Sequence, residues 1–487
     1  MSKTPPTKAA GHDHHELHRV MGPGLLLLFI LGDILGTGVY ALTGKLAANV
    51  GGAAWAPILF AFAVATLSAY SYLELVTKYP GASGAALYAH KAFHKQFLTF
   101  MVTFAVLCSG LTSAATTSMA VANNINLGFG LNWSKTAVVA LAIAFLISLA
   151  VVNFWGSSES VKLNMVLTLI GFLGLALVIG VGIWATINGN VDFSRTVIFE
   201  APQDKSMFLV LSGVTALAFF SFVGFEDSVN MVEEVKDPRI FPKVMLSGMG
   251  ICLAIYIAIS LFTVAIVPIG VLANSDTPLF EVIARGAPGI PIHTLYPFIT
   301  IFAVANTALL NMMMASRLVY GMAKQGVLPR PLGKIHRGHR TPYASIIFTT
   351  ALGVGLLALV GLALGADTTS ALGSTTALLL LAVFTVVNIA CIVLRRDSAA
   401  EAHNHFRAPR WVPYLGAAST IFLIGPWAQK PVVYSIAAVL LLIGVLLSVL
   451  NWLYQRNIKH TDAHLTMGDT QVIAQIVADI PPEDTRR

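Results

Sequence analysis

The strongest constraint on this sequence is a series of about twelve apolar stretches, each close to the length of a membrane-spanning helix. A bilayer core of about 30 Å requires about 20 helical residues, because each residue adds about 1.5 Å along the helix axis. The stretches lie near residues 23–43, 53–77, 97–126, 135–154, 162–187, 207–231, 244–268, 294–323, 343–363, 372–394, 411–428 and 431–454. The sequence therefore predicts an all-α integral membrane protein with about twelve transmembrane helices.

The charge content supports this interpretation. Asp, Glu, Lys and Arg make up 11% of the 487 residues, and hydrophobic residues make up 56%. Soluble proteins carry about 25% charged residues, so this chain has too few charges to cover a soluble protein of its size. The composition argues against a soluble enzyme and against a nucleic-acid-binding protein, although the net charge is +7. The lipid bilayer is the expected surrounding.

The distribution of Lys and Arg predicts the orientation in the membrane. If the N-terminus is inside, 23 of the 30 basic residues fall in cytoplasmic segments, six fall on the opposite side and Arg317 falls within a span. Cytoplasmic loops are enriched in Lys and Arg, so we expect both termini in the cytoplasm and the protein in the cell membrane. Residues 1–20 are polar and show no signal-peptide pattern, so the first span is expected to stay in the mature protein.

Metal, disulfide and enzyme motifs give little signal. Cys108, Cys252 and Cys391 each lie in an apolar stretch and are interpreted as small core residues without disulfides. The N-terminal HDHHELH segment allows a metal site by composition, but a polar tail is favoured because no second ligand cluster accompanies it. The sequence contains no zinc-protease, nucleophile-elbow or phosphate-loop motif. We therefore expect no cofactor, no metal and no enzymatic activity.

The first predicted span is interrupted at its middle. It reads GLLLLFILGDILGTGVYALTG over 24–44, with Gly32, Gly36 and Gly38 around Asp33. Glycine permits unusual backbone conformations and close approach, whereas a carboxylate at mid-membrane is costly and usually functional. A single glycine would indicate only tight helix packing. The cluster beside an acid predicts a discontinuous helix.

The sixth span carries a second polar break, with Ser221 and Gly224 followed by Glu226 and Asp227. Interrupted segments at matching places in two halves indicate inverted repeats with a binding site near the midplane. The predicted organisation is a cytoplasmic tail, a first repeat with spans 1–5, a second repeat with spans 6–10, two additional helices and a second cytoplasmic tail. These segments cover 1–22, 23–190, 205–395, 410–455 and 456–487.

Such breaks also predict the kind of ligand. Lipid cannot satisfy the freed backbone groups, so they must line a cavity or meet a ligand. The N-terminus of a half-helix directs N–H groups at an anion, and a C-terminus directs carbonyl groups at a cation. A site with both arrangements suits a zwitterion such as an α-amino acid.

At these residues the chain resembles the amino acid–polyamine–organocation superfamily of permeases. The resemblance covers about residues 20–400 and rests on four stretches in the same order as in the family. They are GDILGTGVYALTG (32–44), YLELVTKYPGASGAALYAHKAF (72–93), FFSFVGFEDSVNMVEEVKDPRIFPKVM (219–245) and SRLVYGMAKQGVLPRPLGKIHRGHRTPYASI (316–346). The third stretch is the most specific.

The resemblance implies a five-plus-five inverted-repeat fold of the leucine-transporter type. It also implies secondary transport of amino acids or related amines by alternating access, as a symporter or an exchanger. It implies that the substrate carboxylate meets backbone amides of the first break and that the ammonium meets carbonyl groups of both breaks. It also implies that the Phe220 ring closes over the substrate as a gate. The implied substrate-binding residues are Ile34, Gly36, Thr37, Gly38, Phe220, Ser221 and Val223, with the Thr37 hydroxyl as a further carboxylate contact.

Two departures from the family concern ion coupling. Many proton-coupled members carry a lysine in the middle of the fifth span, where this chain aligns Gly171. Many relatives have Ser, Thr or Asn where this chain has Asp33. An acid there could bind a cationic substrate, carry a coupling proton or bind sodium; alternatively, it caps backbone amides freed by the break. The coupling candidates are Asp33, Glu226, Asn306 and Thr307.

Two further interpretations accompany the leading one. Glu74 ends the second span and is expected to pair with a basic loop residue or to cap a helix. The alternative function is a polyamine, organocation or potassium carrier, because GDILGTG is similar to the G-D-I-G-T segment of potassium uptake permeases. The third stretch argues against potassium.

Overall fold

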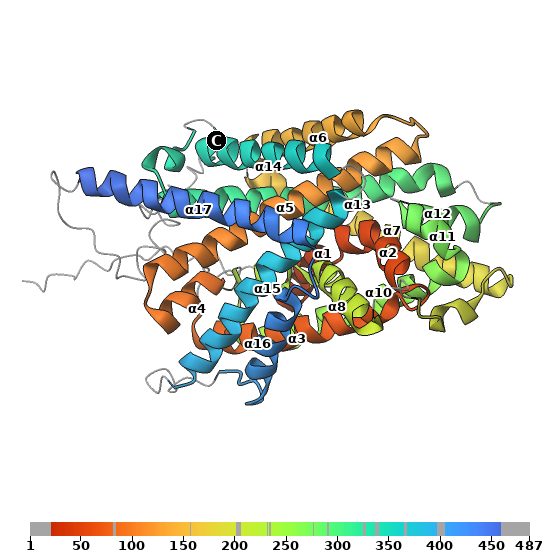
Figure 1. The fold of residues 1–487 in the computed structure, drawn as a ribbon, viewed down its shortest axis with the longest axis horizontal. Coiled ribbons are helices and arrows are strands. Elements are labelled where there is room, and N and C mark those ends of the chain that lie inside the picture. The colour runs from red at the N-terminus through yellow and green to blue at the C-terminus, as the bar shows by residue number, and fades with distance from the viewer. Residues whose placement is uncertain are drawn as a thin grey trace, which may run out of the picture.

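The computed structural model describes residues 21–458 except 81–83, 156, 201–205, 231, 233–234, 276, 290–291, 325–327, 337–338, 340, 365–367 and 397–404. The histidine-rich segment and most of the predicted C-terminal tail therefore lie outside the described residues. The described chain is almost entirely helical (Figure 1). The long helices are α3 (Trp55–Lys78), α5 (Gln96–Gly128), α6 (Lys135–Trp155), α7 (Ser157–Ile187), α10 (Phe241–Ile266), α13 (Ile292–Lys324), α14 (Tyr343–Leu364), α15 (Thr368–Leu394) and α17 (Pro431–Ile458).

The number of membrane-spanning segments is close to the prediction. Within the described residues, ten helical segments are long and apolar enough to cross a membrane, and one bent helix pair makes eleven. The remaining predicted span, 411–428, corresponds to α16 (Val412–Ile424), which has only 13 residues. The predicted C-terminal boundary is too late, because the helix ends before Gly425 and Pro426. The all-α membrane fold is confirmed.

The first predicted break is present. Helix α1 (Pro23–Ile34) and helix α2 (Thr37–Val50) meet at an angle of 40°. The separating residues, Leu35 and Gly36, bond locally: the Gly36 N–H donates to the Ile34 carbonyl oxygen at 2.8 Å. The Leu35 N–H still donates to the Leu31 carbonyl oxygen at 2.8 Å, so the regular helical pattern of α1 ends at Leu35.

The second predicted break divides span six into α8 (Met207–Ala218), the 3-10 turn η2 (Phe219–Phe222) and α9 (Phe225–Asn230). Gly224 stands at the junction with φ +121°, a conformation that L side chains rarely adopt. A Cβ atom there would also lie 3.0 Å from the carboxyl carbon of Asp33. Glycine is therefore required both by the backbone conformation and by the close approach of the two breaks.

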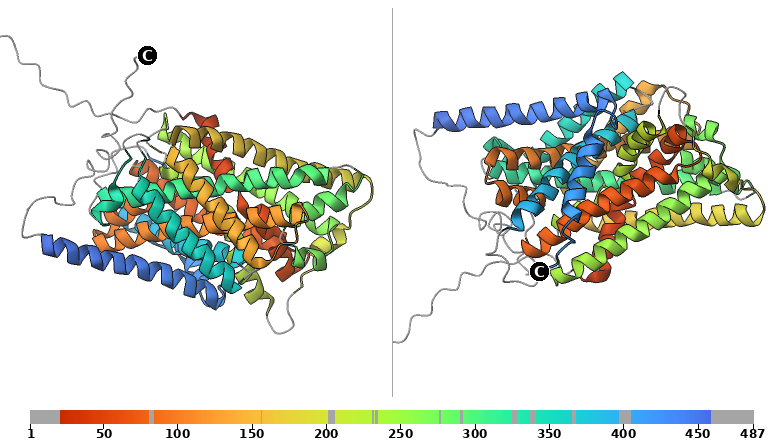
Figure 2. Two further views of the ribbon diagram at one scale, coloured as in Figure 1. Left: turned by 90° about the horizontal axis from the view of Figure 1, so that it is seen from above. Right: turned by 60° about the horizontal axis from the view of Figure 1, so that its bottom comes forward.

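The order of elements is similar in the two halves. Each half begins with a broken helix and a long helix, and its next long helix, α5 or α13, has 33 residues. Between these long helices lie α4 (Gly84–Phe93) in the first half, and α11 (Ile269–Asn274) with α12 (Pro278–Gly286) in the second. The views place α4 at one end of the long axis and α11 and α12 at the other (Figures 1 and 2). Inverted repeats require this placement, and their symmetry stays a prediction.

Helices of the two halves pack directly on one another. Helix α5 runs along α13, α3 packs on α10 and α6 packs on α14. Cys108, Cys252 and Cys391 are buried and free, in agreement with the sequence interpretation. This packing places the two broken helices inside the bundle.

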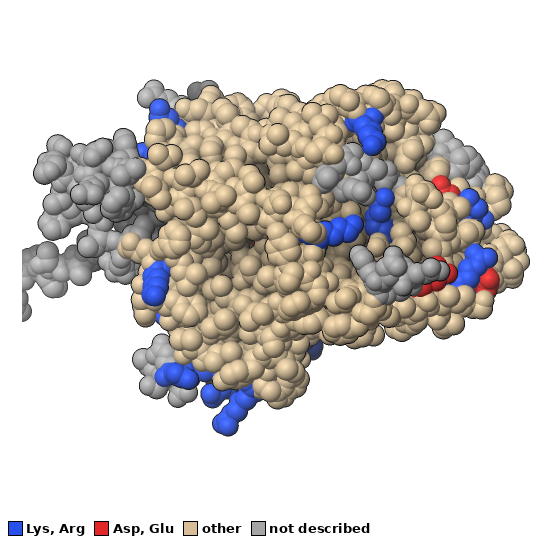
Figure 3. Space-filling view, viewed as in Figure 1, with Lys and Arg blue, Asp and Glu red and all other residues tan. Residues whose placement is uncertain are grey.

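The outer surface is mostly uncharged. Figure 3 shows a face that is mostly uncharged, with a few scattered Lys and Arg side chains and with the visible acidic residues near α11 and α12. On α17, Leu442, Leu446 and Leu450 are between 58% and 61% exposed. Their spacing places them along one side of the helix. An exposed apolar side of this kind suits contact with lipid tails.

A buried ion pair joins the end of α3 to the end of α15. Arg395 Nε and Nη2 donate to the two carboxylate oxygens of Glu74 at 2.7 and 2.5 Å. The Ala408 N–H also donates to Glu74 at 2.9 Å, and Arg395 donates to the carbonyl oxygens of Ala408 and Arg410. We call this group, formed by Glu74, Arg395 and Ala408, the Glu74 clamp. It confirms the predicted pairing of Glu74 with a basic loop residue.

Candidate functional site

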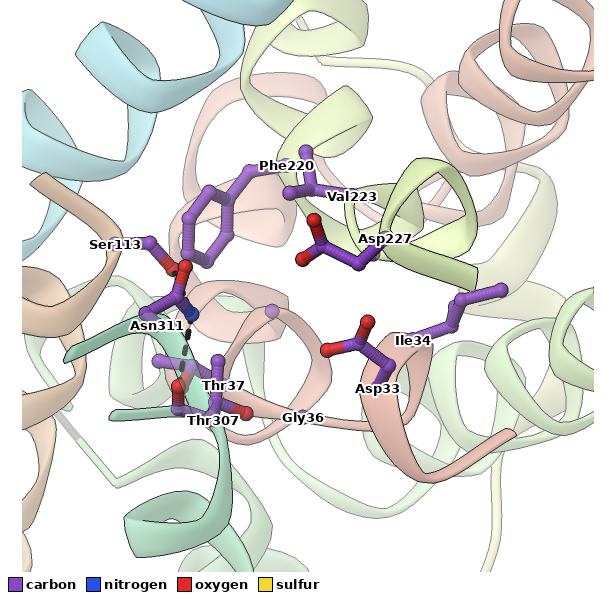
Figure 4. Close-up of a pocket in the computed structure, with 12 residues that line it drawn as sticks. Asp33, Ile34, Gly36, Thr37, Ser113, Phe220, Val223, Asp227, Thr307 and Asn311 are labelled. Atoms are coloured by element: carbon purple, nitrogen blue, oxygen red, sulfur yellow. Dashed lines mark hydrogen bonds between the residues drawn. The ribbon is translucent and has the colours of Figure 1, made fainter. Parts of the chain in front are cut away.

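A small pocket lies between the two breaks, deep in the helical bundle (Figure 4). Its volume is about 20 Å³, room for about one water molecule. A larger ligand therefore requires the surrounding helices to move apart. The lining residues are Asp33, Ile34, Gly36, Thr37, Gly38, Ser113, Phe220, Val223, Gly224, Asp227, Thr307 and Asn311.

The structure brings together most of the residues implied by the resemblance. Ile34, Gly36, Thr37, Gly38, Phe220 and Val223 all line the pocket. Ser221 does not line it but packs behind Gly38: a Cβ atom on Gly38 would lie 2.5 Å from the Ser221 Cα atom. The first and second breaks are thus in backbone contact here, and only glycine fits at position 38.

Asp33 lies in the last turn of α1 and is 5% exposed. Among the described residues, its Oδ2 atom has no hydrogen-bond partner. A buried carboxylate without partners is costly, and the carbonyl end of α1 beside it adds partial negative charge. This arrangement attracts a cation or a proton. It gives no support to the alternative that both oxygens cap backbone amides.

Asp227 is a pocket residue that the sequence analysis did not select. It lies on α9 and is half-buried, and its carboxylate points into the same space as that of Asp33 (Figure 4). The selected neighbour, Glu226, is absent from the lining and accepts a hydrogen bond from the Gly224 N–H at 3.0 Å. Neighbouring helical residues point about 100° apart, so the exact start of α9 decides which acid faces the pocket. The sequence contains no signal for that start.

Neutral polar groups line the opposite wall. Thr307 and Asn311 come from α13 and Ser113 comes from α5 (Figure 4). The Asn311 side-chain amide donates to the Thr307 carbonyl oxygen at 2.8 Å and to the Ser113 hydroxyl at 3.2 Å. The Thr307 hydroxyl is buried and has no partner among the described residues. Ser113 carried no sequence signal, because it lies in a long apolar span without a break.

The hydroxyl of Thr37 is already engaged. It forms a hydrogen bond of 2.7 Å with the Thr117 hydroxyl on α5. The resemblance implied that this hydroxyl could meet the substrate carboxylate. In this conformation it instead connects the start of α2 to α5.

Asn306 faces the first break from behind the pocket. Its side-chain amide donates to the Thr168 hydroxyl at 3.0 Å and to the Gly32 carbonyl oxygen at 3.5 Å. Thr168 on α7 packs against the last turn of α1, since a Cβ atom on Gly32 would lie 2.6 Å from its hydroxyl. Gly171, one turn later, accepts a hydrogen bond from Tyr40. Both α7 positions thus contact the first broken helix, Thr168 at α1 and Gly171 at α2.

Tyr256 connects the two breaks. From α10, its hydroxyl lies 2.5 Å from the Ile34 carbonyl oxygen and 3.0 Å from the Ser221 carbonyl oxygen. A hydroxyl has one proton, so it can donate to only one of these oxygens at a time. Two of the carbonyl groups that the resemblance assigned to the substrate ammonium are therefore contacted by this tyrosine. No pattern in the sequence indicates Tyr256, which lies in an unbroken span.

Phe220 is 4% exposed, and its ring covers one side of the pocket (Figure 4). The ring packs against α15, where a Cβ atom on Gly373 would lie 3.8 Å from it. This position is compatible with the gate implied by the resemblance. The gating role stays a prediction.

No group of three or more potential metal ligands occurs among the described residues. The lining residues, all of them described, include two carboxylates and no Lys, Arg or His. The pocket is thus polar and acidic, with its charge concentrated at Asp33 and Asp227.

Comparisons with known proteins agree with this architecture. Residues 25–462 match the model of the amino acid permease family. A methylthioribose transporter of Bacillus subtilis is 26% identical over 83% of this chain and 87% of its own length. The branched-chain amino acid permease BcaP of the same organism is 23% identical over 93% and 96%. A chloroplastic cationic amino acid transporter 9 of Arabidopsis thaliana is 30% identical over 66% and 58%.

The matched range covers both breaks and every residue of the pocket. The chain belongs to the amino acid permease family of the amino acid–polyamine–organocation superfamily and is a multi-span membrane transporter of amino acids or related compounds.

Proposed function

We propose that the protein is a secondary transporter that moves amino acids or related amines across the cell membrane by alternating access, with both termini in the cytoplasm. The observation that carries the proposal is the pocket itself. Two membrane helices break at the same place, and a buried carboxylate oxygen of Asp33 points into the space between them without a partner among the described residues. Such a group at mid-membrane is costly unless it serves a ligand or an ion.

In the proposed cycle, the substrate binds between the breaks. Its ammonium group meets the carboxylates and the carbonyl end of α1, and a substrate carboxylate meets the backbone N–H groups at the start of α2. The small size of the cavity implies that the bundle opens to one side at a time. Phe220 is placed to cover the substrate during this change.

The names of two of these relatives support an amine-bearing substrate. The relatives include a permease for branched-chain amino acids and a transporter for cationic amino acids, besides a methylthioribose transporter. Uptake of radiolabelled amino acids into proteoliposomes, with unlabelled amino acids and amines as competitors, tests the proposal. We expect saturable uptake that at least one of the unlabelled compounds inhibits competitively. Absence of saturable uptake for the whole panel would contradict it.

We further propose that Asp33 couples transport to a proton gradient. Sodium requires a shell of oxygen acceptors, but Asn306 directs an N–H donor at the Gly32 carbonyl oxygen and Tyr256 directs its hydroxyl at the Ile34 carbonyl oxygen. These donors reduce the number of acceptors free for a metal ion. Asp33 also lies near two other acids, Asp227 and Glu226, so a bound proton relieves repulsion between negative charges.

The driving ion is tested with wild-type proteoliposomes. A pH gradient that is acid inside should stimulate concentrative uptake without sodium, because the unloaded site carries a proton on Asp33 back to the outside, where the substrate ammonium displaces it. An uptake that ignores the pH gradient and requires sodium would contradict the proton role. It would instead implicate the side-chain oxygens of Thr307 and Asn306, which have no partners among the described residues.

A further inference from the structure

The two pocket carboxylates indicate the charge of the substrate. We infer that the site accepts a small molecule with two cationic nitrogen groups, and that Asp33 and Asp227 each bind one of them. The inference rests on the proposed transport function and narrows its substrate class.

The first argument is geometric. Asp33 stands at the end of α1 and Asp227 stands on α9, so each broken helix supplies one acid. Figure 4 shows both carboxylates directed into the same space. A Cβ atom on Gly224 would lie 3.0 Å from the carboxyl carbon of Asp33. The start of α9 therefore lies directly against the end of α1.

The second argument is charge balance. The lining residues, all within the described chain, supply two acids and no Lys, Arg or His, and a buried charge is costly unless it is paired. A neutral amino acid brings one ammonium and one carboxylate, so it leaves the net charge of the pocket unchanged. A molecule with two ammonium groups provides a partner for each acid.

Several other acceptors near the pocket already have partners. Glu226 is bonded to the Gly224 N–H and is absent from the lining. The carbonyl oxygens of Ile34 and Ser221 are contacted by Tyr256. Asp33 Oδ2, by contrast, is buried and has no partner among the described residues. The strongest acceptors facing the pocket are therefore the two aspartates.

Two sources carry this chemistry: amino acids with a cationic side chain, and diamines. The opposite wall, formed by Thr307, Asn311 and Ser113, is uncharged. It therefore neither repels a substrate carboxylate nor requires one. Both sources are therefore tested, each against a partner of similar shape that lacks one cation. The matched pairs are lysine with norleucine, and cadaverine with pentylamine.

The test is competition for uptake by the wild-type protein in proteoliposomes, with each of the four compounds also offered as labelled substrate. We expect the compound with two cations to be preferred over its matched partner by roughly ten- to a hundredfold, the range of one charge-assisted hydrogen bond. Preference in the lysine pair alone would identify amino acids with a cationic side chain as the substrate class. Preference in the cadaverine pair alone would identify diamines. Equal or better recognition of norleucine and pentylamine would overturn the inference.

Variants locate the effect. Asp227→Asn should reduce the preference to near unity, mainly by lowering the apparent affinity for the compound with two cations. Asp227→Glu should retain part of the preference. Glu281→Gln, a half-buried residue on α12 outside the pocket, should leave the preference unchanged. A full preference in a folded Asp227→Asn protein would remove Asp227 from the site.

Failure of the inference differs from failure of the proposed function. Saturable transport of norleucine without preference for lysine or cadaverine would retain the transporter and reject the two-cation site. Absence of saturable uptake for all four compounds and for the wider amino acid panel would reject both.

Discussion

Glu74 and Asp33 are buried carboxylates on membrane helices, yet their surroundings are opposite. Glu74 is 2% exposed and accepts three hydrogen bonds, two from Arg395 and one from the Ala408 N–H. Asp33 is 5% exposed, and its Oδ2 atom has no partner among the described residues. A fully paired acid holds elements together, whereas an acid with a free buried oxygen is available to a ligand or a proton. Burial alone therefore does not distinguish structural from functional acids.

The charge state of the Glu74 clamp follows from its bonds. Hydrogen bonding to Glu74 raises the pKa of the Arg395 guanidinium above its ordinary value, although burial acts in the opposite direction. Because that ordinary value is already far above neutrality, Arg395 stays charged throughout the physiological range. The clamp therefore connects α3, α15 and the segment that contains Ala408 throughout the physiological pH range.

The largest expected effect comes from breaking the clamp. Arg395→Leu leaves the buried Glu74 carboxylate without its charged partner and should lower the free energy of unfolding by about 3–5 kcal/mol. Thermal unfolding in detergent measures the loss. Arg285→Gln is the matched control, because its ion pair with Glu281 is exposed and should contribute at most about 1 kcal/mol. Equal destabilisation by both variants would contradict the structural role of the clamp.

The second prediction disturbs the pocket and spares the clamp. A side chain on Gly38 would collide with the Ser221 backbone, so Gly38→Leu should abolish binding and uptake while the protein still reaches the membrane. Gly250→Ala on α10 is the control, since a Cβ atom there meets nothing within 4 Å. Unchanged affinity in Gly38→Leu would show that the ligand does not bind between the breaks.

The third prediction concerns the ring over the pocket. Phe220→Ala should raise the half-saturation constant about tenfold, because a cation–aromatic contact contributes about 0.5–2 kcal/mol, and it should also leak substrate during exchange. Phe220→Trp should retain more activity, since it keeps an aromatic face. Concentration-dependent uptake compares the two variants. Equal activity in both would indicate that the ring only packs in the core.

The smallest effect is expected at the neutral wall. Thr307→Val removes a buried hydroxyl that has no partner among the described residues, so stability should be retained. Apparent affinity should fall about two- to tenfold, the range for one neutral hydrogen bond. Thr263→Val removes a comparable buried hydroxyl outside the pocket lining and should leave uptake unchanged. Equal responses of the two variants would exclude a ligand contact at Thr307.

The sequence predicts features of the two regions to different extents. Both breaks could be predicted, because glycine clusters and mid-membrane acids leave a local pattern around Asp33 and Gly224. The partner of Glu74 could be predicted only as a class, since Arg395 lies more than 300 residues away. The choice of Asp227 over Glu226 depends on where α9 starts, and the contact of Tyr256 with both breaks depends on the packing of α10. The hydrophobic pattern of the sequence predicts neither the start of α9 nor the packing of α10.

The central claim is that Asp33 is kept for a cation or a proton and not for the fold. The most direct measurement combines uptake and thermal unfolding for Asp33→Asn, which preserves shape and removes the charge. We predict that concentrative uptake driven by a pH gradient is lost and that the unfolding temperature is equal to or above that of the wild-type protein. Exchange across the membrane should persist, with a raised half-saturation constant because one contact with a cationic group is lost. Normal uptake under every gradient, or a collapse in stability like that expected for Arg395→Leu, would contradict the claim.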